Sequence, residues 1–192
     1  MNKLKLFFTA PLLFVAIIII AYLLNLLIPI DLNQYGLRPR SLDGLIGILL
    51  VVFLHGNFSH LFNNIVPLLI LAILLRSYGY QYFIRVTVSL ILVSGLLTWL
   101  LSPSSLIVGA SGLVFAYFSY LITKAIRDKT LITMLVAAVV IISYGGLFFS
   151  LGQFKEGVSW TGHICGFASG ILVALYGSSV LGLSNADREK VI

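Results

Sequence analysis

Charged residues are scarce in this chain. Only 9% of its 192 residues are charged and 60% are hydrophobic, whereas about 25% are charged in a typical soluble domain. A chain of this composition cannot cover itself with a polar surface, so we expect a membrane protein. Cysteine is almost absent as well. Cys165 is the single cysteine, which excludes an internal disulfide and leaves the redox compartment open.

The few acidic residues avoid the apolar segments. All six lie in predicted loops or in the tail: Asp31, Asp43, Asp128, Glu156, Asp187 and Glu189. Their placement argues against aspartyl chemistry at membrane depth, and against a transporter or channel, which often carries ionisable groups along its pathway. No basic stripe interleaved with aromatic residues indicates a nucleic-acid partner, and no HExxH motif indicates a metal. We expect no cofactor either.

Long apolar runs are abundant, and about 20 apolar residues suffice for a helix to cross a bilayer. The sequence predicts an all-α polytopic membrane protein in which residues 1–192 form a single six-span domain with no separate soluble domain. The predicted spans are residues 7–29, 60–76, 82–101, 111–127, 130–150 and 161–182. The first run exceeds the roughly 7–15 residues of a signal-peptide core, and no clear cleavage site follows it, so we expect an uncleaved span.

The basic residues predict an orientation. With the N-terminus in the cytoplasm, nine of the twelve basic residues fall on the inner side, as the positive-inside rule requires. The nine are Lys3, Lys5, Arg76, Arg85, Lys124, Arg127, Lys129, Arg188 and Lys190. We expect a multi-pass protein of a prokaryotic plasma (inner) membrane, embedded in the lipid bilayer, with both termini cytoplasmic.

Two segments depart from a plain bundle. Residues 30–59 are mostly apolar but are interrupted by glycines and Pro39, which predicts a partly embedded first loop with short helices, whose backbone must be satisfied by protein or water. The second is residues 102–109, which precede a rather short helix. We expect this loop to descend into the protein, so that the helix begins at Ser111 below the outer surface.

Gly109-Ala110-Ser111-Gly112 stands at the expected start of that helix. Unpaired amides at a helix N-terminus favour an anion, and acyl transfer needs a nucleophile beside such donors. Glycines on both sides allow a tight turn and close backbone approach. A serine N-cap between small packing residues explains the tetrapeptide equally well, so both interpretations stay open.

His163 lies inside the last apolar run, and Gly166 and Gly170 follow it on the same helical face. Two glycines four positions apart let another helix approach closely. The small face around Gly112 is a suitable partner, so His163 is expected near Ser111 as a general base. The alternative is a histidine that bonds a backbone carbonyl. No acid is available to orient it, so the predicted machinery is a Ser111–His163 dyad.

His60 and Asn64 form a third group, one helical turn apart on the opening turns of the second span. An imidazole and an amide that converge there could complete an oxyanion hole. A metal site is a minor alternative, because the nearby histidines and asparagines have no carboxylate beside them. For His55 and Asn63 we favour plain hydrogen bonds within the embedded loop.

Taken together, these motifs resemble those of the rhomboid intramembrane serine proteases. The matching elements are Gly109-Ala-Ser111-Gly112, His163-x-x-Gly166-x-x-x-Gly170 and His60-x-x-x-Asn64, in the family's order and across essentially the whole chain. The resemblance implies Ser111 as nucleophile and His163 as base. It also implies an oxyanion hole formed by Asn64, His60 and the Ser111 amide. Its implied substrates are transmembrane proteins, cut near the outer end of their spans after small residues.

The chain departs from the family pattern at two places. Phe115 stands where many members have a tyrosine that stacks on the catalytic histidine, so a ring remains and the hydroxyl is lost. The common Trp-Arg pair of the first loop is replaced by Gly36-Leu-Arg38-Pro39-Arg40, so details of loop anchoring do not transfer.

Residues 145–152, with their glycines and bulky apolar side chains, fit a mobile lid over the site as well as they fit lipid-facing packing. The main functional alternative to a protease is a noncatalytic rhomboid-like protein that binds membrane clients for quality control. The presence of both serine and histidine argues against it.

Overall fold

The computed structural model describes residues 3–103, 106–146 and 159–180. Regular structure in these ranges is helical apart from one isolated bridge between Leu37 and Ile107, which confirms the all-α prediction. The elements in chain order are α1 (Lys3–Leu27), η1 (Leu32–Tyr35), α2 (Gly47–Leu50), η2 (Val51–Phe53), α3 (Phe58–Arg76), α4 (Tyr80–Leu101), α5 (Ser111–Asp128), α6 (Leu131–Tyr144) and α8 (Trp160–Val180).

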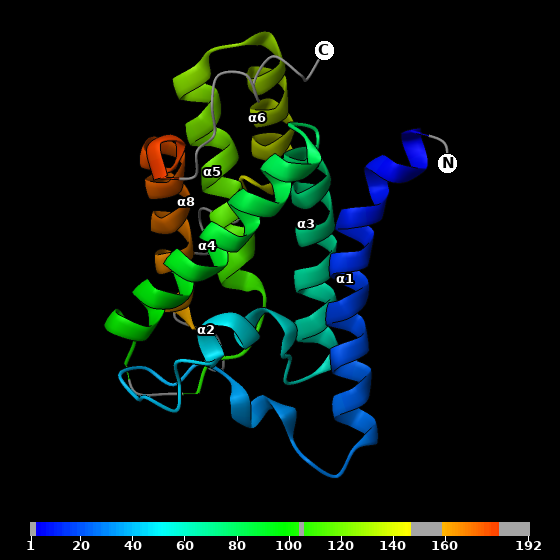
Figure 1. Cartoon of the computed structure of the whole chain (residues 1–192), viewed down its shortest axis with the longest axis vertical. Coiled ribbons are helices and arrows are strands. Elements are labelled where there is room, and N and C mark those ends of the chain that lie inside the picture. The colour runs from blue at the N-terminus through cyan, green and yellow to red at the C-terminus, as the bar shows by residue number, and fades with distance from the viewer. Residues whose placement is uncertain (1–2, 104–105, 147–158, 181–192) are drawn as a thin grey trace.

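A helix forms at each of the six predicted spans, and successive long helices run in opposite directions (Figure 1). The segment Phe7–Leu27 of α1, together with α3 and α4, is long and apolar enough to cross a membrane, and α6 is a shorter apolar helix. The six-span topology stays a prediction. The fifth helix is shorter than expected from residues 130–150, because it ends at Tyr144, where Gly145 follows as the C-cap. Residues 147–150, 181 and 182 of the predicted spans lie outside the described ranges.

Polar caps set the starts of three helices. Asn57 accepts a hydrogen bond from the His60 amide at 2.8 Å, and Thr130 forms a capping box with Thr133. Ser159 Oγ accepts from the Gly162 amide at 3.2 Å, so Ser159 caps the start of α8. This cap fixes the register of the first turns of α8.

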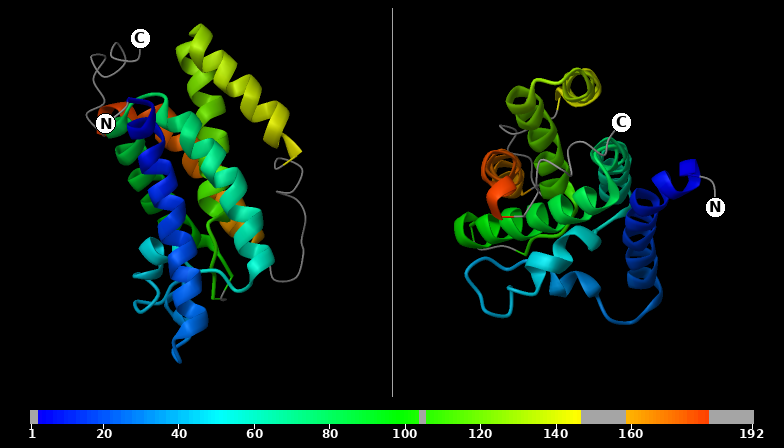
Figure 2. Two further views of the ribbon diagram at one scale, coloured as in Figure 1. Left: turned by 90° about the vertical axis from the view of Figure 1, so that its right-hand side faces the viewer. Right: turned by 45° about the horizontal axis from the view of Figure 1, so that its top comes forward.

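Helix α5 is the centre of the bundle. Every side chain from Leu113 to Leu121 is buried, and the helix packs most extensively on α8 and also on α6, α3 and α4. Helix α1 packs on α3 at the edge of the bundle (Figure 2). Near the end of α5, the Lys124–Asp128 ion pair is itself largely buried.

The first long loop contains η1, α2 and η2, in agreement with the short helices predicted for it. Its first part is fixed to the chain before α5 by two backbone hydrogen bonds between Leu37 and Ile107, each 2.9 Å long. The Arg40 guanidinium donates to the carbonyl of Ser102 at 2.6 Å, and Trp99 Nε1 donates to the carbonyl of Ser41 at 2.9 Å. The segment that replaces the family's Trp-Arg pair is therefore anchored to the end of α4.

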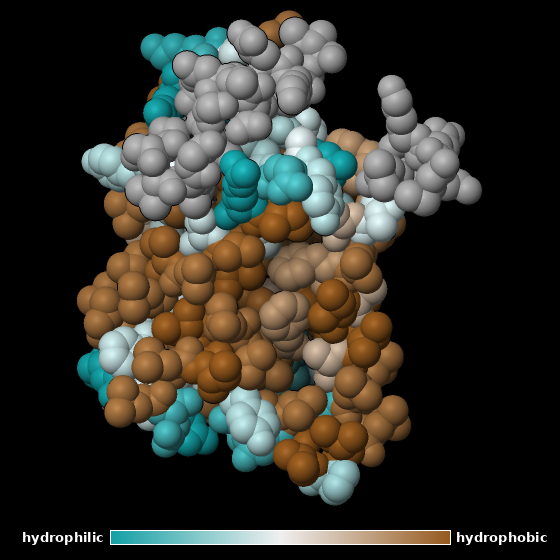
Figure 3. All heavy atoms as spheres, viewed as in Figure 1, coloured by the Kyte–Doolittle hydropathy of each residue, from teal (hydrophilic) through white to brown (hydrophobic). Residues whose placement is uncertain are grey.

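The surface has an apolar band between two polar ends (Figure 3). Exposed leucine and isoleucine side chains such as Leu13, Ile17 and Leu96 contribute to the band, and such a surface is expected of a membrane protein. We call the end that carries the α3–α4 and α5–α6 turns, with Arg76, Lys124 and Arg127 near it, the basic end. We call the opposite end, which carries residues 28–57, the loop end (Figure 1).

Candidate active site

The turn before α5 positions Ser111 at a helix N-terminus. Gly109 has φ +120°, a conformation that side chains rarely allow, and its amide donates to the Val51 carbonyl at 2.9 Å. The Ala110 amide donates to His55 Nε2 at 3.4 Å. Two contacts with the first loop thus hold the turn that leads into Ser111.

His55 links the first loop to the turn before α5. Its side chain is 1% exposed and accepts a hydrogen bond from the turn before α5. Burial, followed by the charge of His60, lowers the pKa of His55 to about 4. The ring is therefore neutral near pH 7 and able to accept the Ala110 hydrogen bond. Asn63 is exposed and bonds Ser59 Oγ at 3.5 Å, within its own helix.

His60 and Asn64 converge on Gly109 from the first turns of α3. A Cβ built on Gly109 would lie 2.5 Å from His60 Nε2 and 3.6 Å from Asn64 Nδ2. Asn64 is 5% exposed and donates one amide hydrogen to the His60 carbonyl at 2.9 Å. The second amide hydrogen is left for another acceptor. The structure thus brings both side chains beside the turn that carries Ser111.

Helices α5 and α8 approach closely through their glycines. A Cβ on Gly166 would collide with the Gly112 carbonyl, and a Cβ on Gly170 would collide with Ser119 and the Ala116 carbonyl. The Ser119 hydroxyl donates across the interface to the Phe167 carbonyl at 2.7 Å. The glycines at positions 112, 166 and 170 thus lie at this interface, and their helix-packing role stays a prediction. Gly109 lies instead in the turn before α5, where its neighbour is His60.

The same interface orients His163. Its imidazole lies against the Phe115 ring, with centroids 4.4 Å apart and planes inclined by 30°. His163 is 9% exposed, and its Nδ1 has no hydrogen-bond partner among the described residues. The ring is thus held by aromatic packing, and no carboxylate among the described residues orients it.

Ser111 and His163 lie on facing helices. Ser111 is one turn before Phe115 and therefore on the same face of α5, and Phe115 is the ring that His163 contacts. Within the described residues no hydrogen bond joins Ser111 to His163. Catalytic hydrogen bonds are often long in unliganded structures and tighten when substrate binds.

A small cavity of about 30 Å³ opens beside Ser111 and is lined by Gly109, Gly162, Ser159 and residues of α4. A polar cavity of about 10–15 Å³ already holds one water molecule. Two lining residues, Ser94 and Thr98, were not anticipated from the sequence. The sequence feature that could have identified them is a pair of small polar residues one turn apart within an apolar helix.

Among the described residues, no group of three or more histidine, cysteine, aspartate or glutamate side chains is arranged to hold a metal ion. The predicted lid, residues 145–152, falls almost entirely outside the described ranges, since only Gly145 and Gly146 are described.

Comparison with known proteins gives a consistent result. A family model described as a rhomboid domain matches residues 43–180. Uncharacterized proteins of Mycobacterium bovis and Mycobacterium tuberculosis are 34% identical over 177 residues, which cover 86% of this chain and 73% of each relative. An uncharacterized protein of Mycobacterium leprae is 33% identical over 172 residues, 84% of this chain and 67% of the relative.

Proposed function

The chain belongs to the rhomboid family, and from this premise we propose that it is an intramembrane serine endopeptidase that cleaves the transmembrane segments of membrane proteins. The observation that carries the proposal is the α5–α8 interface. There, glycine contacts bring the helix of Ser111 against the helix of His163, and the His163 ring packs on Phe115, one turn from Ser111.

In the proposed reaction, Ser111 Oγ attacks the carbonyl carbon of the scissile peptide bond while His163 accepts the hydroxyl proton. The imidazolium then protonates the leaving amine, and an acyl-enzyme forms on Ser111. A water molecule, activated by His163, hydrolyses the acyl-enzyme and regenerates the hydroxyl. The small cavity beside Ser111 supports the last step, because it is large enough for water.

The negative charge that develops on the carbonyl oxygen needs donors. We assign this role to the Ser111 amide at the start of α5, to the second amide hydrogen of Asn64 and to Nε2–H of His60. Their convergence around Gly109 supports the assignment. Donors held in place before the reaction stabilise the transition state without reorganisation.

The proposed topology has six spans, with the basic end in the cytoplasm and the loop end outside. The alternating helix directions in Figure 1 support it, as does the concentration of basic residues at one end. Both termini would then be cytoplasmic and the membrane would be a prokaryotic plasma membrane. The active site would open toward the outer half of the bilayer, so a substrate span would be cut near its outer end.

The test is cleavage of a purified single-span model substrate in detergent. We expect cleavage by the wild type and none by Ser111→Ala or His163→Ala. Ser89→Ala is the matched control, since this serine bonds only the Arg85 carbonyl of its own helix, and it should cleave as the wild type does. Full cleavage by Ser111→Ala would end the proposal. A wild type that binds the substrate but cleaves nothing would favour the noncatalytic alternative.

A further inference from the structure

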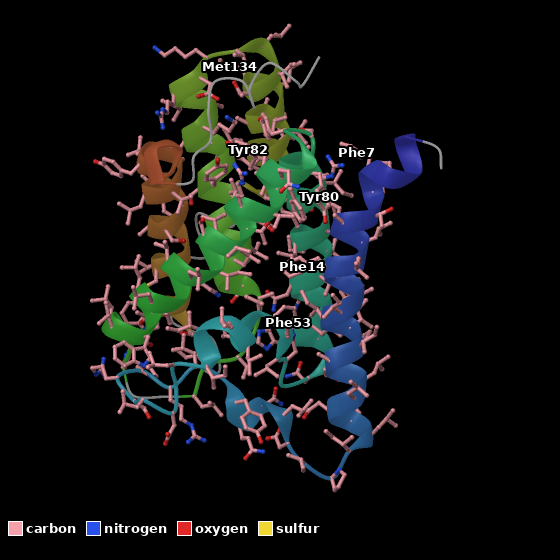
Figure 4. The ribbon with its side chains drawn as sticks, in the orientation of Figure 1. Phe7, Phe14, Phe53, Tyr80, Tyr82 and Met134 are labelled. Carbon is pink, nitrogen blue, oxygen red and sulfur yellow. The ribbon has the colours of Figure 1, made fainter. Side chains whose placement is uncertain are left out.

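A groove runs between α1 and α4, away from the candidate active site. Its volume is about 660 Å³, within the roughly 300–1,000 Å³ of small-molecule sites. Leu13 and Ile17 line it from α1, and Ile84 and Val88 line it from α4. Phe53 lies toward its loop end and Tyr80 toward its basic end (Figure 4). Both helices contribute residues at helical spacing, so the groove is a continuous apolar channel along the bundle.

One charged side chain borders this apolar surface. Arg76, at the end of α3, is the only charged residue among the described residues that line the groove. Its guanidinium lies 5.3 Å from the Phe7 ring centroid and 5.5 Å from that of Tyr80. These two rings come from the helices on either side of the groove. The cation is therefore fixed at the basic end of the groove by aromatic contacts.

Among the described residues, no carboxylate pairs with the Arg76 cation. Arg76 Nε is buried and has no hydrogen-bond partner among the described residues. The one ion pair in the described ranges joins Lys124 to Asp128, so no described carboxylate neutralises Arg76. A buried donor without an acceptor is costly, and an arginine fork matches phosphate oxygens in charge and geometry.

We infer that the groove binds one anionic phospholipid of the surrounding bilayer, with an acyl chain between α1 and α4 and the phosphate on Arg76. Basic pockets between helices on the cytoplasmic side are suited to anionic headgroups. A second copy of the chain would add another basic end, and an apolar substrate helix would bring no anion to Arg76. The positive charge of Arg76 therefore favours an anionic phospholipid over a second copy of the chain and over an apolar substrate helix.

The test is native mass spectrometry of the full chain in detergent, incubated with phosphatidylglycerol or with phosphatidylcholine that carries the same acyl chains. We expect the wild type to retain phosphatidylglycerol preferentially. Arg76→Gln should lower this preference by about fivefold, the effect expected from one basic residue near a lipid headgroup. The matched control is Arg85→Gln, because Arg85 is exposed and does not line the groove. It should keep the preference of the wild type.

A second variant tests the groove without changing the charge. Val88→Trp fills the apolar channel and should reduce retention of both lipids. If circular dichroism shows that Arg76→Gln is unfolded, Val88→Trp still tests whether the groove binds lipid. The inference is overturned if the wild type shows no preference for phosphatidylglycerol, or if Arg85→Gln lowers that preference as much as Arg76→Gln does. It also fails if inorganic phosphate displaces the lipid, or if Val88→Trp dissolves a dimer and leaves lipid retention unchanged. The measurement needs no catalytic activity, so its outcome is independent of the proposed protease function.

Discussion

The ring of Phe115 on α5 lies against the imidazole of His163 on α8, with 4.4 Å between their centroids. In a site whose described residues offer His163 Nδ1 no hydrogen-bond partner, this contact is what orients the proposed base. The tyrosine common at this position in the family would keep the ring contact, and the phenylalanine shows that the contact needs no hydroxyl.

Phe115→Leu should therefore lower kcat about two- to tenfold, because the aliphatic side chain fills space but loses the aromatic contact, which contributes about 0.5–1.5 kcal/mol. Phe115→Tyr restores the ring and should stay near the wild type. The measurement is kcat and KM on a model substrate, with thermal unfolding of each variant as the control. Equal kcat for leucine and tyrosine variants would contradict a positioning role.

Asn64→Ala should lower kcat by about 10²–10³-fold with little change in KM, which is the usual effect of losing one oxyanion donor. Asn63→Ala is a matched control on the next residue, because Asn63 is exposed and bonds only Ser59. Steady-state kinetics of both variants check the assignment. If the two substitutions have the same effect, Asn64 is not a donor to the transition state.

Gly166→Ala should destabilise the protein by about 1–3 kcal/mol, since its methyl group would meet the Gly112 carbonyl, which belongs to the backbone and cannot turn aside. Gly56→Ala is the control, because a Cβ there meets nothing within 4 Å. The free energy of unfolding in mixed micelles gives the comparison. A Gly166→Ala variant as stable as the control would contradict the close packing of α5 and α8.

The buried His55 should make the stability of the protein depend on pH. Its pKa is about 4 in the folded protein and about 6.5 in an unfolded chain, so between these values the unfolded state binds more protons. Stability must then fall as the pH is lowered from 6.5 to 4. His55→Gln should reduce this fall. Thermal unfolding of both proteins at pH 7, 6 and 5 measures it, and parallel pH curves would contradict the burial of His55.

Much of the fold was predictable because apolar runs of this length have one stable form in lipid, a helix that satisfies its own backbone. The glycine spacing after His163 is a local signal, and in the structure a Cβ on Gly166 or Gly170 would collide with α5. The end of α6 at Tyr144 was missed, because the apolar run in the sequence continues past Gly145, the C-cap of the helix.

Contacts between distant segments were the part that sequence could not supply. His55 bonds Ala110, 55 positions away, and Ser94 and Thr98 reach the cavity beside Ser111 from another helix. Neither follows from spacing within a segment. The contacts of Arg76 with Phe7 and Tyr80 are a similar case, since they depend on how α1 stands against α4.

The most direct measurement of the central claim is labelling of the purified protein with a fluorophosphonate probe, followed by mass spectrometry of the peptide that contains Ser111. We expect modification of Ser111 in the wild type, none in Ser111→Ala, and a rate about 10²–10⁴-fold lower in His163→Ala, which lacks the base. A folded wild type that does not react, or equal labelling of Ser111→Ala, would contradict it.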